Sequence, residues 1–132
     1  MATTLILHAT LINEGMRFPG SVLIKDGKID KILPSETDCQ ADETIDATGM
    51  YLLPGVIDDH VHFRDPGLTH KADMVSESRA AAAGGVTSYF DMPNCKPQTT
   101  TLEALNTKSD DAATKSLVNY AFFLGATVEN AN

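Results

Sequence analysis

The second part of the sequence alternates strand-like and helix-like segments, and this alternation restricts the fold more than any other feature. Short apolar runs predict strands at residues 56–63, 86–92 and 117–124. The segments between them, residues 72–83 and 101–115, have helical character. A strand-helix-strand-helix-strand order is typical of a parallel α/β sheet covered by its connecting helices.

Local signals mark an end of each predicted helix. Gly84-Gly85 follows the alanine-rich first helix, and glycine can take the left-handed conformation that ends a helix. Thr100 and Glu103 have the spacing of a capping box, so Thr100 is expected to cap the second helix.

Residues 1–54 have a different pattern and predict a small all-β domain of sandwich-like type. Residues 4–12 read as a strand, and residues 21–33 read as a hairpin. The hairpin prediction depends on Asp26-Gly27, because Asp-Gly between two alternating runs is a strong turn signal. Residues 44–47 are expected to add a short strand.

The stretch Leu53–Gly67 joins these two parts and contains the residues best suited to chemistry. In a strand from Val56 to Phe63, Asp58, His60 and His62 would share one face, and Arg64 would follow on the same side. Two imidazoles side by side on a strand offer a workable bite for Zn²⁺. Asp58 would then not be a ligand but would support a histidine ligand through its second ring nitrogen or pack in the barrel core. The alternative for Arg64 is a surface salt bridge with Asp65.

These residues resemble a known family. Leu53–Gly67 is similar to the metal-binding signature of the amidohydrolase superfamily, and the segment from His60 to Gly67, HVHFRDPG, resembles its dihydroorotase branch. Met92-Pro-Asn94 at the end of the second predicted strand resembles the Met-Pro-Asn motif of the same branch. Asp91 precedes this motif, and the sequence assigns it no role.

The resemblance implies a set of site residues. His60 and His62 would bind one Zn²⁺ of a probable pair, while Arg64 and Asn94 would hold the carboxylate of the substrate. The general acid/base and the remaining metal ligands are expected beyond residue 132.

The resemblance also implies the N-terminal part of a (β/α)₈ barrel. Such a barrel needs roughly 200–250 residues, so residues 55–132 would supply its first three βα units and leave it incomplete. We therefore expect the 132 residues to be the N-terminal part of a longer polypeptide.

The implied activity is that of a dihydroorotase, which reversibly hydrolyses the cyclic amide of L-dihydroorotate to N-carbamoyl-L-aspartate in pyrimidine synthesis. A hydantoinase, dihydropyrimidinase or allantoinase is the nearest alternative, although these relatives generally lack the counterparts of Arg64 and of the Met-Pro-Asn pattern. A non-catalytic dihydroorotase-like subunit is a further alternative, and the presence of both histidines argues against it.

Composition limits the partners. The net charge of −8 argues against nucleic acid and against an anionic membrane surface. A small-molecule substrate fits, and a homo-oligomer remains open. No basic region followed by an apolar run opens the sequence, and the two cysteines, Cys39 and Cys95, do not suggest a disulfide framework. The expected compartment is the reducing cytoplasm.

Overall fold

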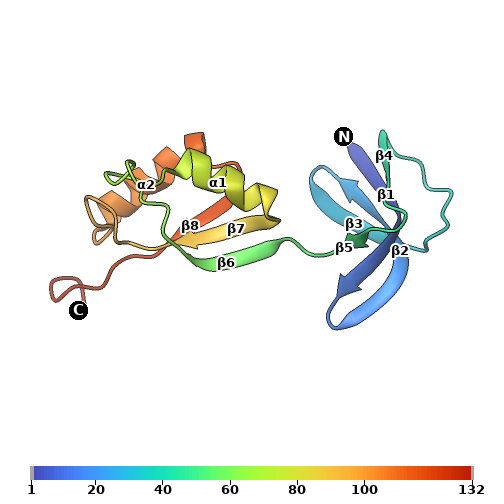
Figure 1. Cartoon of the computed structure of the whole chain (residues 1–132), viewed down its shortest axis with the longest axis horizontal. Coiled ribbons are helices and arrows are strands. Elements are labelled where there is room, and N and C mark those ends of the chain that lie inside the picture. The colour runs from blue at the N-terminus through green and yellow to red at the C-terminus, as the bar shows by residue number, and fades with distance from the viewer. Residues whose placement is uncertain (1, 132) are drawn as a thin grey trace. The chain divides into compact units, whose positions relative to one another are not determined.

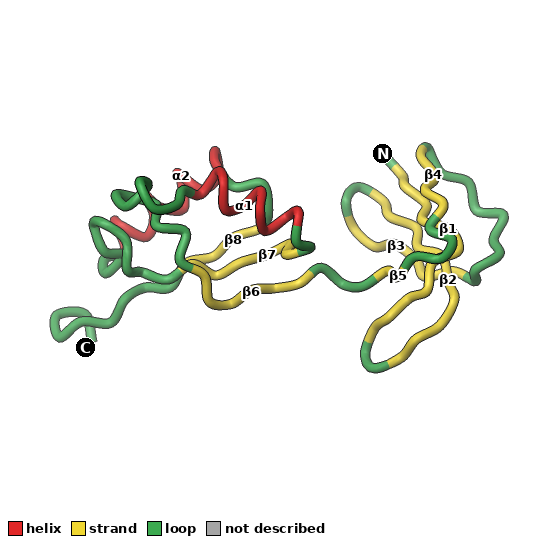
Figure 2. Tube along the Cα trace, viewed as in Figure 1, coloured by secondary structure: helices red, strands yellow, loops and turns green. Residues whose placement is uncertain are grey.

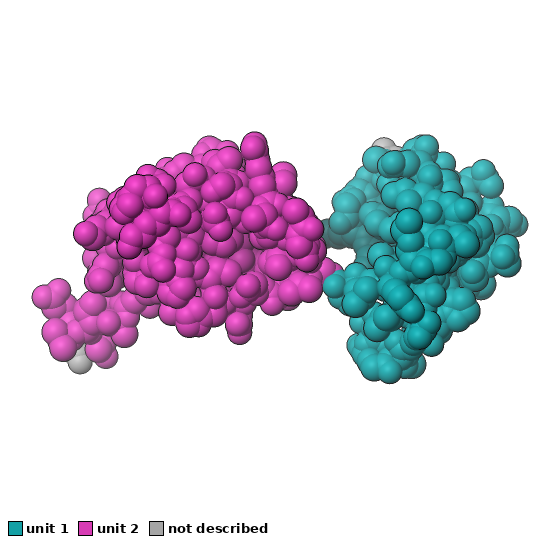
Figure 3. All heavy atoms as spheres, in the orientation of Figure 1, with its two compact units in different colours: residues 1–54 teal, residues 55–132 magenta. Residues whose placement is uncertain are grey.

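The computed structural model describes residues 2–131 of the chain. These residues form two compact units, residues 2–54 and residues 55–131 (Figure 3). Each unit has its own sheet, so each is described separately (Figures 1 and 2).

The first unit is a single mixed sheet. Its strands run in the order β3-β2-β1-β4, and β5 pairs with another part of β1. Neighbours along β1, β2 and β3 are antiparallel, whereas β4 and β5 are parallel to β1. The strands are β1 (Thr3–Asn13), β2 (Met16–Lys25), β3 (Lys28–Leu33), β4 (Glu43–Asp46) and β5 (Tyr51–Leu52).

Two tight turns build this sheet. Asp26 and Gly27 have φ values of 49° and 75°, and positive φ at both central residues is the mark of a type I′ hairpin turn. The predicted hairpin is therefore present. Glu14 and Gly15 repeat the same conformation, with φ of 50° and 76°, and join β1 to β2. The sequence analysis missed this second hairpin because Glu-Gly is a weaker turn signal than Asp-Gly.

A bulge at His8 divides β1. The register with β2 shifts between Ile6 and Ala9, and His8 has a φ of 59°. Before the bulge, β1 pairs with β4, and after it β1 pairs with β5. One long strand thus holds two short strands on the same edge.

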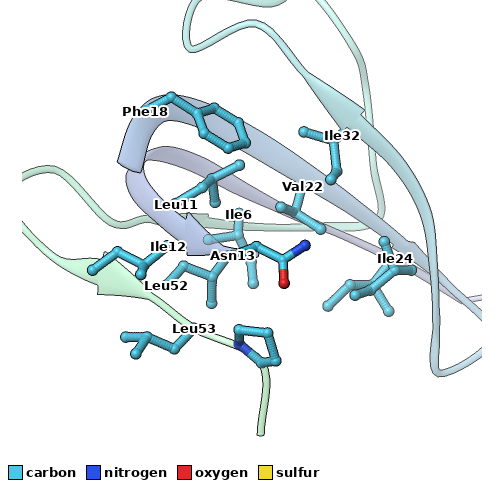
Figure 4. A pocket seen from close by; sticks show the side chains of 12 residues that line it. Ile6, Leu11, Ile12, Asn13, Phe18, Val22, Ile24, Ile32, Leu52 and Leu53 are labelled. Carbon is cyan, nitrogen blue, oxygen red and sulfur yellow. The ribbon is translucent and has the colours of Figure 1, made fainter. Parts of the chain in front are cut away.

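An apolar pocket of about 150 Å³ lies in the first unit (Figure 4). Its walls come from β1, β2, β3 and the segment around β5, and include Leu11, Phe18, Val22, Ile32 and Leu52. The sequence predicted a sandwich-like domain, but residues 2–54 form one sheet whose apolar side chains line this pocket. A sandwich requires a second sheet to pack on the first, and residues 2–54 contain none.

The second unit is a parallel sheet in the order β6-β7-β8, as the alternating pattern predicted. Both helices lie on one side of the sheet (Figures 1 and 2). The elements follow the chain as β6 (Val56–Val61), α1 (Met74–Ala83), β7 (Val86–Asp91), α2 (Leu102–Lys115) and β8 (Asn119–Phe122). Among residues 2–131, neither helix has the length and hydrophobicity that a transmembrane segment requires.

Side-chain caps begin both helices. The Asp73 side chain accepts a hydrogen bond from Ser76 N, and this bond holds the pKa of Asp73 below its usual value. The cap of α2 is Thr101, which accepts from Ala104 N, rather than Thr100 as the capping-box pattern predicted. Gly84 caps the end of α1, and Gly85 takes a φ of 84°.

The core of the second unit fills the space between sheet and helices. Phe63, Met74, Tyr89 and Ala112 form its buried centre. Tyr89 is fully buried against Phe63, with ring centroids 4.3 Å apart. Its hydroxyl has no hydrogen-bond partner among the described residues, since the Ser116 hydroxyl donates to Val118 O instead. Burial raises the pKa of Tyr89 to about 12.

We predict that residues 1–132 expressed alone self-associate. Ile29 and Ile32 beside the pocket are 71% and 57% exposed, and the β6-β7-β8 sheet carries helices on one side only. Contiguous exposed apolar surface of this kind promotes association. Size-exclusion chromatography should show mixed oligomers that bind a hydrophobic dye. Lys at both positions should reduce dye binding, and a monomer with a cooperative melt would contradict the prediction.

A second prediction concerns alkaline pH. Because folding raises the pKa of Tyr89 from about 10 to about 12, its contribution to stability is complete below pH ~10 and is lost as the pH rises through ~12. Tyr89→Phe removes the titrating group and leaves no partner unpaired. Denaturant unfolding between pH 9 and pH 12 should show a smaller loss of stability in Tyr89→Phe than in the wild type. Equal losses would refute this role, and Tyr51→Phe, at an exposed position, serves as the control.

Candidate metal and substrate site

The candidate site lies where the parallel strands β6 and β7 end. Carboxyl ends of parallel strands meet at one edge of a sheet, and ligands bind at this edge in α/β folds. His60 is the penultimate residue of β6, and His62 is the first residue after the strand ends at Val61. Asn94 lies three residues after the end of β7. The structure thus brings together three of the four residues that the sequence singled out.

The two imidazoles are neighbours. Their ring centroids are 5.2 Å apart, with an angle of 64° between the planes, and both side chains are exposed. His62 Nδ1 lies 2.8 Å from Asn94 Oδ1. An amide oxygen only accepts hydrogen bonds, so Nδ1 carries the proton and Nε2 keeps its lone pair. The contact leaves His62 with Nε2 as its metal-binding atom.

The loops after β6 and β7 are packed directly against one another. Lys96 N donates to Pro66 O at 3.0 Å. Gly67 has a φ of 81°, and a Cβ at this position would overlap the Lys96 carbonyl. Only glycine fits this conformation and this contact. The close approach of the loops supports the short distance between His62 and Asn94.

The prediction that Asp58, His60 and His62 share one face of a regular strand holds only in part. Asp58 pairs with Tyr89 and Val61 with Asp91, so three steps along β6 match two steps along β7. A strand with such a bulge loses its strict alternation. Asp58 accepts from His60 N at 3.2 Å, which is a main-chain contact and not the predicted support of an imidazole.

Arg64 departs further from the prediction. The strand ends at Val61 rather than Phe63, and Arg64 has a φ of 65°. A non-glycine residue in the left-handed region is uncommon, and such residues gather at functional sites. Arg64 O accepts from Leu68 N at 3.0 Å, so Arg64 begins a turn. Arg64 therefore does not continue the alternation of side chains along β6.

Asp65 is not the partner of Arg64. The Asp65 carboxylate is buried and lies 3.2 Å from Lys115 Nζ. Burial alone would lower the pKa of Lys115, but hydrogen bonds to Asp65 and Asp111 outweigh it and raise this pKa. Within residues 2–131, Arg64 takes part in no ion pair, so its guanidinium remains available to an anionic ligand.

The sequence analysis missed a buried ion pair behind the site. Lys108 Nζ lies 2.7 Å from Asp91 Oδ2, and both side chains are 1% exposed. Two features of the sequence could have predicted it. Asp91 is the one charged residue in the predicted strand 86–92, and Lys108 follows the spacing of Leu105 and Ala112 on the inward stripe of α2.

The described residues do not by themselves complete a metal site. Among residues 2–131, no group of three or more His, Cys, Asp or Glu side chains is placed to hold a metal ion. A catalytic zinc site needs about three protein ligands, and His60 and His62 would be two of them.

Comparison with known proteins identifies the family. Residues 49–131 match the model of the family described as dihydro-orotase-like. The chain belongs to this family. The matched range contains the positions of the histidine pair, Arg64 and Asn94.

The relatives that the chain resembles are named for different enzyme activities. The chain is 42% identical over 130 residues to a protein of Streptomyces avermitilis named allantoinase, and 41% identical over 117 residues to one of Lactobacillus johnsonii named dihydroorotase. These matches cover 96% and 89% of the chain, but only 29% and 27% of the relatives. The chain thus spans less than a third of their length.

A solved structure confirms the fold. The L-hydantoinase (dihydropyrimidinase) from Arthrobacter aurescens superimposes with a TM-score of 0.93 at 34% identity. The match covers 98% of the chain and 29% of that structure. The two units therefore have the fold of one part of a hydantoinase.

Proposed function

We propose that this chain forms part of a metal-dependent cyclic amidohydrolase, and that His60 and His62 are two of its metal ligands. The observation that carries the proposal is the side-by-side placement of the two imidazoles, with Asn94 Oδ1 on His62 Nδ1. A metal-binding histidine usually donates its other ring N–H to such an acceptor, which fixes its tautomer and orientation.

The donor set fits Zn²⁺. Neutral imidazoles at exposed strand ends suit zinc, and a zinc pair would take its further ligands and the general acid/base from residues beyond 132. When bound, Zn²⁺ lowers the pKa of a coordinated water to about 7 and polarises a carbonyl oxygen. His60 and His62 would hold the ion at the edge of the sheet, and the contact with Asn94 would keep His62 in the ligating tautomer.

We infer that the substrate carries a carboxylate, as dihydroorotate does. Arg64 makes no ion pair among the described residues, because Lys115 occupies the neighbouring Asp65. A guanidinium binds a carboxylate through two parallel hydrogen bonds. Asn94 uses its oxygen on His62, which leaves its amide N–H groups to donate to the same carboxylate.

The specific activity that we propose is that of a dihydroorotase in pyrimidine synthesis, acting on L-dihydroorotate and N-carbamoyl-L-aspartate in the cytoplasm. The fold that we propose for the complete protein is a (β/α)₈ barrel, to which residues 55–132 contribute the first three βα units. Three parallel strands with helices on one side support this arrangement.

Allantoin or hydantoin hydrolysis is the second candidate. It is favoured by the relative named allantoinase, at 42% identity, and by the structural match to an L-hydantoinase. The ring substrates of such enzymes lack the carboxylate of dihydroorotate, so the two candidates differ in what they require of Arg64.

The metal prediction is tested in the complete protein. His60→Ala and His62→Ala should each lose bound zinc and nearly all activity, because each removes a ligand. His70→Ala changes an exposed histidine in the loop after β6 and should keep full zinc content. Zinc is measured by elemental analysis of purified protein. Full occupancy in both ligand variants would disprove the assignment.

The substrate prediction uses Arg64→Lys, which keeps the positive charge but loses the two-pronged geometry. A hydrogen bond to a charged group contributes about 1.5–3 kcal/mol, so KM for dihydroorotate should rise about 10- to 100-fold. Zinc content should not change, and Arg79→Lys on the exposed surface of α1 is the matched control. An unchanged KM, or a wild type that prefers allantoin or hydantoin, would favour the second candidate.

A further inference from the structure

The buried Asp91–Lys108 pair is the one fully buried ion pair among residues 2–131, and neither side chain is used by the proposed chemistry. Asp91 ends β7, and Lys108 lies in the middle of α2. The Lys108 ammonium also lies 4.8 Å from the centre of the Phe122 ring. Helix α2 is thus joined to the strand ends by a charged contact inside the core.

Each partner also binds the main chain beside the candidate site. Asp91 Oδ1 accepts from Phe63 N at 3.0 Å, and Lys108 Nζ donates to Met92 O at 3.2 Å. Phe63 stands between His62 and Arg64, and Met92 is two residues before Asn94. The pair therefore fixes the main chain on both sides of the His62–Asn94 contact.

Stability alone is a poor explanation for such a pair. Removing two charges from water is costly, and apolar replacements of a buried pair are often neutral or stabilising. Apart from a contact of Lys108 Nζ with Cys95 Sγ at 3.9 Å, the remaining hydrogen bonds of this pair go to the backbone at two strand ends, which is better explained by orientation. Side chains around a metal site commonly act in this way, through the ligands that they position.

We propose that Asp91 and Lys108 are positioning residues, which hold the ends of β6 and β7 so that His62 and Asn94 stay in contact. The proposal rests on the proposed function for its metal readout. The local geometry that it describes is independent of that function.

A second ion pair provides the matched control. Asp65 and Lys115 also join the loop after β6 to α2, with Nζ and Oδ2 3.2 Å apart. The other contact of Asp65 is with Met74 N, at the start of α1, and not with a strand end. Losing this pair should affect the helices and leave the histidines in place.

The experiment compares neutral double variants of the complete protein. Asp91→Asn with Lys108→Gln removes both charges but keeps side chains able to bond Phe63 N and Met92 O. Asp91→Leu with Lys108→Met removes both charges and both bonds. Asp65→Leu with Lys115→Met is the control. Zinc affinity is measured by competition with a chromophoric chelator, and amide hydrogen exchange is measured over residues 60–66.

We expect the leucine–methionine variant at 91 and 108 to lose zinc affinity about 10- to 100-fold and to exchange faster over residues 60–66. The asparagine–glutamine variant and the control should remain within about threefold of the wild type, the scatter usual for such context-dependent effects. A folded leucine–methionine variant with wild-type affinity and exchange would overturn the proposal.

Two further outcomes are decisive. If the leucine–methionine variant does not fold, Asp91→Asn with Lys108→Met replaces it, since it keeps an acceptor for Phe63 N and lacks the contacts of Lys108 with Met92 O and Cys95 Sγ. This variant is compared with the asparagine–glutamine variant by zinc affinity and by amide hydrogen exchange over residues 88–94. Equal values in the two variants would overturn the role of Lys108. If the wild type binds no zinc, the proposed function fails, and exchange alone decides whether the pair positions the strand ends.

Discussion

The parallel pairing of β6 with β7 is the constraint on which the candidate site depends. It brings the ends of two strands together, and with them His62 and Asn94, which are 32 residues apart in sequence. The hydrogen bond from Phe63 N to Asp91 crosses the same two strand ends over 28 residues. Without this register, His62 would lack the acceptor that fixes its tautomer.

The charged side chains around the site differ in whether they are paired within the protein. Asp91 at the end of β7 is paired with Lys108, and Asp65 in the loop after β6 is paired with Lys115, so α2 supplies the cation to both carboxylates. Arg64 keeps an unpaired cation among the described residues, on a protein whose net charge is −8. A local positive group of this kind can select an anionic substrate even when the protein as a whole is acidic.

Membership of the dihydro-orotase-like family narrows the chemistry without choosing the substrate. Relatives at 34–42% identity have the names allantoinase, dihydroorotase and L-hydantoinase. These names all denote cyclic amidohydrolases.

The sequence by itself determined the features that depend on neighbouring residues. These were the Asp26-Gly27 turn, the strand-helix alternation after Pro54, the glycine end of α1 and the adjacent histidines. Tertiary structure decided the bulge in β6, the left-handed Arg64, and the pairing of Asp65 with Lys115, 50 residues away. It also decided the burial of Lys108. A lysine on a helix is expected to be solvent-exposed, and here Asp91 of the underlying sheet pairs with it inside the core. Such contacts follow from strand register and loop path, and neither is encoded within a few residues of the side chains that meet.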